Sequence, residues 1–437
     1  MSGQPDSPSG SGAADILAAE EDLLRALFSA LPDAMADPEF GVSFAHYLRR
    51  RMQRLHPPGQ ADIRQVRSRD GQVFSIDLGD RFAAEIYYGR FAEPFELALL
   101  AAVCEPQSVF VDVGANFGLY AVTCGRNIEP ERGGCVLAVE PAPPVLPLLE
   151  RNVEHNGLAD RVEVIRACAG QSDGETLFHV ATESSLSGIS ATGRSTVAEV
   201  ATMPLRALAS LVRERGRDRL DLLKVDAEGH EHGVLLGALP LLESHECIVM
   251  IETSAKNLDA SRRAALRDVL RRLVDAGYAL RWLDPAQGKL RTAEAPEPLV
   301  AMTGASVFLT RRDSESERRL LAAAAEVRMM DDTFPSFVPL PADGRAAPGA
   351  AAVSGHPRDL PVTLAIHLQR ERERNAELAE LLAEREWLAR GIERIAAGQE
   401  RILEEARLGR GGRGASARGA WHRLLDMAGR LLPTGRS

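Results

Sequence analysis

A glycine-rich turn that follows an apolar strand carries the first chemical signal of this sequence. Residues 109–113 read Val-Phe-Val-Asp-Val, the β-branched run that a strand covered on both faces requires. Gly114 and Gly118 follow, and glycine lets a backbone or a ligand approach closely because it has no Cβ atom. Such a strand ends in the crevice where open α/β sheets bind ligands. The stretch therefore predicts a site for a nucleotide-type cofactor.

Two cofactor classes compete for this turn. A dinucleotide site would show the pattern Gly-x-Gly-x-x-Gly, whereas residues 114–118 read Gly-Ala-Asn-Phe-Gly and Asp112 precedes them. A negative charge at Asp112 would repel a pyrophosphate, but it would attract the ammonium and sulfonium groups of S-adenosylmethionine. Asp112 therefore favours S-adenosylmethionine over NAD.

Glu140 supplies the second signal. It ends the next predicted strand, residues 135–139, and stands before Pro141. An acid at this position can accept hydrogen bonds from a ribose diol. NAD sites use the same device, so Glu140 supports a bound nucleoside without separating the two cofactors. The alternative is a surface glutamate in front of a proline.

A third group of charged residues follows the very apolar strand predicted at 220–225. Unpaired charges are costly to bury, so we expect these side chains to line the crevice. Asp226 could hold the substrate or the cofactor's amino group, and Glu228 could accept a proton from a hydroxyl. Lys224 could pair with these acids or face a developing oxyanion. The alternative is helix capping by the two acids, with a salt bridge from Lys224.

Glu252 ends the following strand and faces the same edge of the crevice. With Asp226 and Glu228 it could form an all-oxygen magnesium site, but acids at strand ends often only cap helices, and no metal is expected. His230 and His232 have no zinc-type spacing with a nearby cysteine. We therefore interpret both histidines as ordinary helix-start residues.

Four motifs in this order resemble those of the FkbM family of S-adenosylmethionine-dependent methyltransferases. They are Asp112-Val113-Gly114-Ala115-Asn116-x-Gly118, Val139-Glu140-Pro141, Asn152-Val153 with Asn156-Gly157, and the run from Lys224 to Glu231. The resemblance covers roughly residues 95–312 and implies a class I methyltransferase fold and O-methylation, commonly of sugar or natural-product hydroxyls. Ala227 is a mild departure, because family members often have Val or Ile there.

The resemblance also implies roles for individual residues. The predicted cofactor-binding residues are Asp112, Gly114, Ala115, Asn116, Gly118 and Glu140. The predicted reaction centre comprises Lys224, Asp226, Glu228 and Glu231.

The elements that would position these residues alternate along the chain. Strands are predicted at 109–113, 135–139, 162–167, 176–181, 220–225 and 247–251, and helices at 145–156, 205–215, 234–242 and 262–276. Strands at 279–283 and 306–310 can close the sheet as a final hairpin. Such alternation predicts an α/β fold, Rossmann-like, with a mostly parallel seven-stranded sheet and helices on both faces. The polar segment 183–199 could be a lid or substrate loop, or a disordered connection.

Segments of different character flank this domain. Residues 1–14 are expected to be disordered, and 15–94 to form a cap with helices at 16–31 and 40–55 and a hairpin within 63–86. The methyltransferase-like domain would span 95–312, followed by a helix and a Pro/Ala/Gly linker over 313–360. Residues 361–408 predict a long helix, either a self-associating coiled coil or a lone solvated helix. The basic tail, 409–437, could contact a membrane surface or stay a floppy tail.

Composition excludes several function classes. The chain has 437 residues, 45% of them hydrophobic and 26% charged, which is typical of one sizeable core with appendages. A net charge of −10 argues against nucleic-acid binding by the chain as a whole. The five cysteines lack CxxC spacing, so we expect buried free thiols in a reducing cytoplasm. No apolar run reaches the roughly 18 residues of a membrane span, which with the lack of a signal-peptide pattern predicts a cytoplasmic protein.

We therefore expect an S-adenosylmethionine-dependent O-methyltransferase. Its partner would be a hydroxyl-bearing substrate, with a sugar of a bacterial glycan as the leading class and a natural product as the other. A carboxylate within 226–231 would orient or deprotonate the hydroxyl, and positioning would supply much of the rate because the sulfonium is already activated. Two alternatives remain. One is a non-catalytic tethering protein that acts through its C-terminal coiled coil, and the other is an NAD-dependent oxidoreductase, which Asp112 disfavours.

Overall fold

The chain divides into two compact units, residues 1–57 with 346–437, and residues 58–345. The computed structural model describes residues 20, 21, 23–25, 27, 38–89, 93–189, 196–284, 289–327 and 337–340. Within the first unit it describes helix α3 (Pro38–Leu55). The predicted disordered start (1–14), coiled coil (361–408) and basic tail (409–437) lie outside the described residues. No helix among the described residues is long and apolar enough to cross a membrane.

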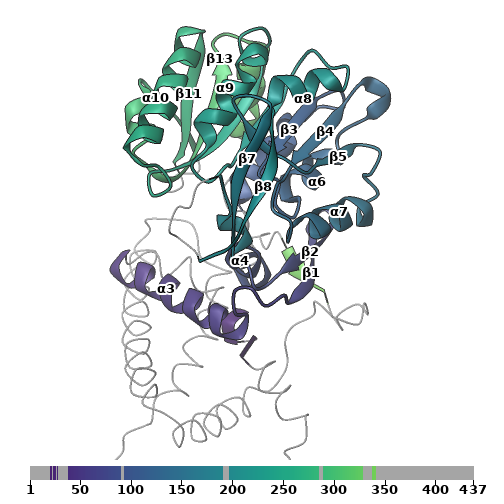
Figure 1. Cartoon of the computed structure of the whole chain (residues 1–437), viewed down its shortest axis with the longest axis vertical. Helices are drawn as coiled ribbons and strands as arrows, with labels where there is room; N and C mark the ends of the chain where they lie inside the picture. The colour runs from purple at the N-terminus through teal and green to yellow at the C-terminus, as the bar shows by residue number, and fades with distance from the viewer. Residues whose placement is uncertain are drawn as a thin grey trace, which may run out of the picture. The chain divides into compact units, whose positions relative to one another are not determined.

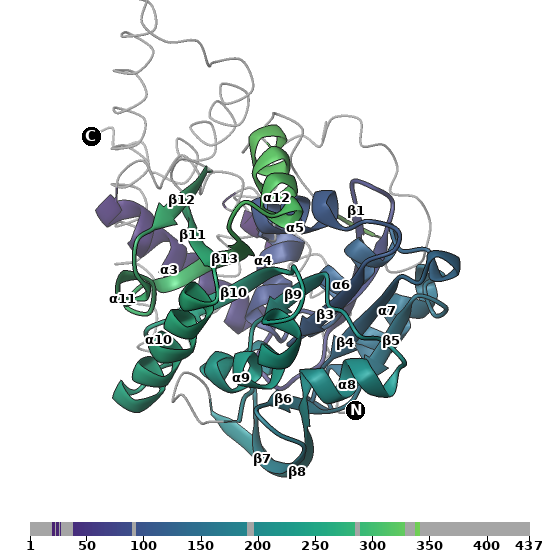
Figure 2. The same ribbon diagram turned by 90° about the horizontal axis from the view of Figure 1, so that it is seen from above.

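The second unit is built on an eight-stranded sheet (Figure 1). Its strand order is β12-β11-β13-β10-β9-β3-β4-β5, as labelled in Figure 2. Its strands are β3 (Val109–Val113), β4 (Cys135–Val139), β5 (Val162–Ile165), β9 (Leu222–Val225), β10 (Ile248–Ser254), β11 (Tyr278–Asp284), β12 (Lys289–Ala293) and β13 (Thr303–Arg311). The five neighbouring strands β5, β4, β3, β9 and β10 pair in parallel. Strands β13, β11 and β12 are added to this sheet by antiparallel pairing. The α/β fold with a mostly parallel sheet is confirmed. Strand β12 was not predicted, and the predicted strand at 176–181 lies in a separate, smaller sheet.

Helices cover both faces of this sheet (Figure 2). On one face lie α8 (Leu208–Glu214), α9 (Glu231–Leu242) and α10 (Ala260–Asp275), and on the other lie α5 (Pro94–Val103), α6 (Leu119–Gly125) and α12 (Glu315–Glu326). Helix α7 (Leu146–His155) lies beside β5, and the short helix α11 (Pro296–Leu299) precedes β13. The predicted class I methyltransferase architecture therefore stands, with helices on both sides of the strands.

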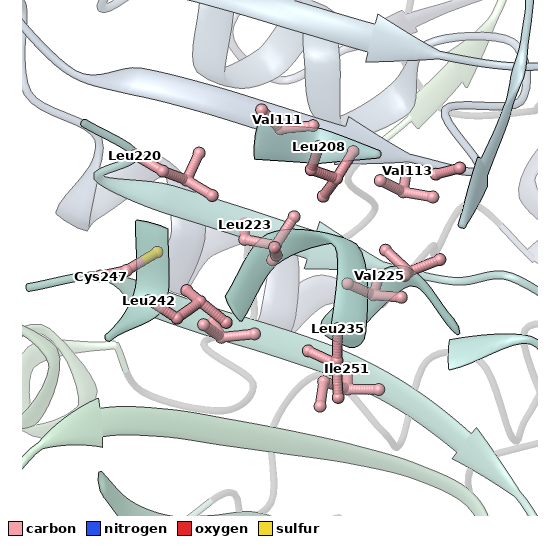
Figure 3. Packing of buried hydrophobic residues seen from close by; sticks show 14 of the residues in the cluster. Val111, Val113, Leu208, Leu220, Leu223, Val225, Leu235, Leu242, Cys247 and Ile251 are labelled. Carbon is pink, nitrogen blue, oxygen red and sulfur yellow. The ribbon is translucent and has the colours of Figure 1, made fainter. Parts of the chain in front are cut away.

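Side-chain alternation along the strands directs residues to two different faces of the sheet. Val111, Val113, Leu223 and Val225 are at most 4% exposed and pack against α8 and α9 (Figure 3). Truncation of such a residue to alanine typically costs about 2–5 kcal/mol. Because successive strand residues point to opposite faces, the residues between these apolar positions point toward α5 and α6. Two of them, Asp112 and Lys224, are charged, and they are direct neighbours across β3 and β9.

Two small sheets complete the unit. One has the order β14-β1-β2, from β1 (Ile63–Ser68), β2 (Val73–Asp77) and β14 (Phe337–Pro339). The other has the order β6-β8-β7, from β6 (Cys168–Gly170), β7 (Gly174–Ala181) and β8 (Val197–Ala207).

Three local predictions differ from the structure. Residues 81–86, predicted as part of the first hairpin, belong to helix α4 (Arg81–Gly89). Asp80 accepts hydrogen bonds from the amides of Phe82 and Ala83 and caps the first turn of this helix. Residues 205–207, predicted as helical, belong to β8, where pairing with β6 overrides helix propensity. The short strand β14 lies within the expected linker and pairs with β1.

Asn152 and Asn156 on α7 explain the third sequence motif. Asn152 is fully buried; its Nδ2 donates to the carbonyls of Ser75 at 3.0 Å and Phe117 at 2.8 Å, and its Oδ1 accepts from the Ser75 amide at 2.6 Å. Asn156 exchanges a similar pair of bonds with the backbone of Val73. The two side-chain amides thus pair with backbone amide and carbonyl groups of β2, as a neighbouring strand would. Through its bond to Phe117, Asn152 also ties the first hairpin to the glycine turn.

We predict that Asn152→Ala lowers the free energy of unfolding by about 2–4 kcal/mol, because it orphans buried backbone groups that have no access to water. Urea unfolding followed by circular dichroism measures the change. Asn127→Ala is the matched control, since Asn127 donates to the carbonyl of Ala101 in an exposed position and its loss should stay below about 1 kcal/mol. Equal losses in the two variants would contradict this role of Asn152.

Candidate active site

An open pocket lies at the carboxyl ends of β3, β4 and β9, the place that the sequence predicted for ligand binding. Its polar lining residues are Asn116, Glu140, Cys168, Ser185, Ser187, Asp226, Glu228 and His230. Apolar side chains from the strand ends and from β7 complete the wall. The structure therefore brings the glycine turn, Glu140 and two acids of the third motif to one place.

The glycines of the turn are required by contacts within the protein. Gly114 has φ of 71°, and a Cβ atom there would overlap the main-chain oxygen of Asp226. Gly118 has φ of 93°, and a Cβ there would come within 2.7 Å of Leu149 Cδ1. These positive φ values and close approaches exclude other residues. The turn can therefore bring the end of β9 directly against the end of β3.

Glu140 connects the loop after β3 with the loop after β4, and both loops line the pocket. Its Oε2 accepts from the Asn116 amide and its Oε1 from the Ala142 amide, each at 2.8 Å. The side chain is 6% exposed, and burial raises its pKa to about 7. An ionised carboxylate has about four lone-pair positions, so both oxygens can still accept hydrogen bonds from a ribose diol. Contact of Glu140 with a ribose stays a prediction, and the structure places its carboxylate at the pocket.

Asp112 lies beneath the turn and not in the pocket wall. It is fully buried, and its Oδ1 is 3.6 Å from Lys224 Nζ. Burial raises the pKa of this carboxyl above its usual value. Asp112 was expected to attract the cofactor's cations directly. In the structure its nearest positive charge is Lys224, so it acts on the pocket through that lysine.

Lys224 connects the floor of the site to its acids. It is 4% exposed; its Nζ donates to the Gly114 carbonyl at 2.9 Å and lies 3.6 Å from Asp226 Oδ2. The ammonium also lies 5.3 Å from the centre of the Tyr120 ring. Burial opposes the charge, but the carboxylates of Asp226 and Asp112 together raise the pKa of Lys224 above its usual value. Lys224 is therefore a permanent buried cation.

A second set of acids faces Lys224 from α5 and β10. The Tyr120 hydroxyl donates to Glu93 Oε2 at 2.5 Å. Glu93 stands at the start of α5 with a left-handed backbone, φ 39°, and its side chain makes no capping hydrogen bond to that helix. Burial raises the pKa of Glu93 to about 7. The charge of Asp226, together with burial, raises the pKa of Glu252 to about 9. Glu252 is therefore protonated at neutral pH.

Some acids of the third motif line the pocket, and another stabilises the backbone next to it. Asp226, with a side chain 32% exposed, and Glu228 line the pocket. The Oε2 of Glu228 accepts from Asn257 Nδ2 at 2.6 Å. Glu231 is 3% exposed and its Oε1 accepts from the Gly229 amide at 2.8 Å, so it stabilises the turn into α9. Burial raises the pKa of Glu231 to about 7.

Sequence reasoning missed some of the residues that surround the pocket. His230, interpreted as an ordinary helix-start residue, lines the pocket, and burial lowers its pKa to about 4, so its ring is neutral. Glu93 and Tyr120 receive no role from the sequence, because only the packing of α5 on α6 brings the two side chains together.

No group of three or more His, Cys, Asp or Glu side chains in the described part of the chain is placed to hold a metal ion. The magnesium alternative from Asp226, Glu228 and Glu252 therefore gains no support. All five cysteines are free, and all but Cys135 are buried.

Comparison with known proteins identifies the domain. Residues 112–280 match the family model of the methyltransferase FkbM domain. AMB antimetabolite synthetase AmbE from Pseudomonas aeruginosa is 30% identical over 209 residues, a match that covers 39% of this chain and 10% of AmbE. The chain thus spans about a tenth of the length of this relative.

Two solved structures are similar at low identity. The methyltransferase FkbM from Methylobacillus flagellatus is 16% identical, with 47% of this chain and 44% of that chain covered and a TM-score of 0.30. The O-methyltransferase from Bacillus cereus in complex with SAH is 13% identical, with 53% and 86% covered and a TM-score of 0.31. The family match confirms the sequence resemblance: the chain carries an S-adenosylmethionine-dependent methyltransferase domain of the FkbM family. It favours this activity over an NAD-dependent oxidoreductase.

We predict that the affinity for S-adenosylmethionine rises about tenfold between pH 6 and pH 8. The ionised form of Glu140 is the better acceptor for ribose hydroxyls, and with a pKa of about 7 this group is about nine-tenths protonated at pH 6, so binding must displace a proton there. Isothermal titration calorimetry over this pH range measures the change.

Glu140→Gln should bind about tenfold more weakly at pH 8 and lose most of this pH dependence. Glu231→Gln is the control, because Glu231 has a similar pKa but is turned into the protein. It should keep the pH dependence of the wild type. A flat profile in the wild type, or the same loss in both variants, would show that Glu140 does not bind the cofactor.

Proposed function

We propose that this FkbM methyltransferase domain transfers a methyl group from S-adenosylmethionine to a hydroxyl of a saccharide or a natural product. The observation that carries the proposal is that two carboxylates of the third motif, Asp226 and Glu228, line the same pocket as Glu140. A nucleoside-binding acid and possible proton acceptors therefore share one cavity.

The lining of the pocket fits S-adenosylmethionine. Glu140 would accept hydrogen bonds from the ribose. The side chains of Val139, Val145, Phe178 and Ile189 supply apolar surface for a purine. At the β9 side, the carboxylates would attract the cofactor's two cations. When bound, S-adenosylmethionine supplies an electrophilic methyl group whose transfer leaves a neutral thioether.

Asp226 is the residue we assign to the proton of the acceptor hydroxyl. As the oxygen–methyl bond forms, the hydroxyl proton must leave the oxygen, and a carboxylate within hydrogen-bond reach can take it. Asp226 is partly exposed to the pocket, and Lys224 at 3.6 Å stabilises its negative charge and fixes its position. Glu228, held by Asn257, would orient the acceptor.

The acids that line the pocket suit an acceptor with several hydroxyl groups. Asp226 and Glu228 place carboxylate oxygens, which accept hydrogen bonds, in the pocket. A sugar presents several hydroxyl donors that match such acceptors. The partial likeness to AmbE, by name an antimetabolite synthetase, supports a natural product as the second acceptor class.

We expect Asp226→Asn to lower kcat for methyl transfer by about 100-fold or more, because the amide cannot take the hydroxyl proton. The assay measures transfer of tritiated methyl groups from S-adenosylmethionine to a panel of oligosaccharides and natural-product alcohols. Affinity for S-adenosylmethionine should change by less than about tenfold, since one contact at most is altered.

Asp268→Asn is the control, because Asp268 forms an exposed ion pair with Arg267 on α10 and should leave transfer unchanged. Full activity of Asp226→Asn would refute its role as the proton acceptor. A wild-type chain that binds no S-adenosylmethionine would instead favour the non-catalytic tethering protein.

A further inference from the structure

The short strand β14 adds a third strand to the first hairpin from a distant part of the chain. It pairs antiparallel with β1, with Phe337 opposite Ser68, and the Leu340 amide donates to the Gln65 carbonyl at 2.8 Å. Figure 1 shows it as the short green strand beside the purple strands β1 and β2. Because β14 has three residues and lies at the edge of its sheet, it can leave β1 at a lower cost than global unfolding.

Phe337 anchors β14 in the protein interior. Its side chain is 1% exposed, and its ring meets the ring of Phe74 on β2 edge to face, with the ring centres 5.9 Å apart. Phe74 makes the same kind of contact with Phe117, at 6.3 Å. Phe74 and Phe117 are also buried. A continuous row of aromatic contacts, Phe337–Phe74–Phe117, therefore runs from β14 through the first hairpin to the glycine turn.

Phe117 follows a pocket residue with an uncommon backbone. Asn116 lines the pocket and has a left-handed backbone, φ 49°. Its amide donates to Glu140, and its Oδ1 accepts from the Phe117 amide at 2.8 Å. A left-handed residue other than glycine persists where its surroundings hold it. The packing of Phe117 is thus part of what keeps Asn116 and the Glu140 contact in place.

We propose that Phe337 is a positioning residue for cofactor binding and that β14 acts as a strap on the glycine turn. While β14 is docked on β1, the aromatic row holds the turn in the form that binds S-adenosylmethionine. When β14 leaves, Phe74 loses a packing partner and the turn binds the cofactor more weakly. The inference goes beyond the proposed function, because it concerns control of cofactor binding and holds for any acceptor.

Reciprocity gives this strap a quantitative signature. If docking of β14 raises the affinity for the cofactor by some factor, then the bound cofactor must raise the docking of β14 by the same factor. A residue that only stabilises the fold has no such link to one local opening.

Calorimetry with S-adenosylmethionine on the full chain measures the first half of this link. Phe337→Ala should weaken binding about five- to tenfold, the lower end of typical couplings between sites. Phe337→Leu keeps most of the apolar volume and should bind within about threefold of the wild type. Leu340→Pro removes the amide that pairs with Gln65 but leaves the rings, and it should also weaken binding. Leu321→Ala, at a side chain 42% exposed on α12, is the control and should bind as the wild type does.

Hydrogen exchange on the wild type measures the second half. Saturating S-adenosylmethionine should slow exchange of the Leu340 amide by about the same five- to tenfold factor. Exchange of the Arg312 amide, which donates to the Gly277 carbonyl in another sheet, should not change.

Wild-type affinity in both Phe337→Ala and Leu340→Pro would overturn the strap. Equal slowing of the Leu340 and Arg312 amides would also overturn it, because the cofactor would then stabilise the whole unit and not the docking of β14. Thermal unfolding without ligand checks that each variant folds. If the variants do not fold, the two amides in the wild type decide the question alone.

Discussion

The buried ammonium of Lys224 is the interaction on which the site depends. It lies between Asp112 and Asp226, at 3.6 Å from each, and donates to the carbonyl of Gly114. Burial of these charges without partners would cost several kcal/mol, and removal of one partner from such a buried pair typically costs about 3–5 kcal/mol. The lysine thus joins the floor of the pocket, the glycine turn and the acid at the end of β9. Together with the close approach at Gly114, it sets where the ends of β3 and β9 meet.

Hydrogen bonds from neighbouring groups fix the positions of the residues that line the pocket. Glu140 is held by the amides of two loops, and Glu228 by Asn257. Glu231 holds the turn that carries Glu228. Asn152 holds Phe117 in the glycine turn. Catalytic positioning needs this kind of support, because small displacements of reacting groups are costly in rate. Several motif residues are therefore explained by the support they give and not by contact with a ligand.

The sequence predicted the order of the main strands and helices well, because their apolar runs end at clear signals such as Glu140-Pro141 and Gly157. It also placed Asp226 and Glu228 in the crevice. The sequence did not indicate that Asp112 and Lys224 are neighbours, because this depends on the register of β3 with β9. Glu93 and Ser185 could not be found from the sequence either, since their positions depend on the packing of α5 and on the hydrogen bond to Asp80. Strand β12, with mostly exposed residues, has no apolar run to reveal it.

The most direct test of this account is a crystal structure of the chain with S-adenosylhomocysteine. The account predicts the ribose hydroxyls within about 3.2 Å of the carboxylate oxygens of Glu140. The sulfur should lie on the Asp226 side of the pocket, above the turn that contains Gly114. A nucleoside bound away from Glu140, or a sulfur remote from Asp226, would contradict it.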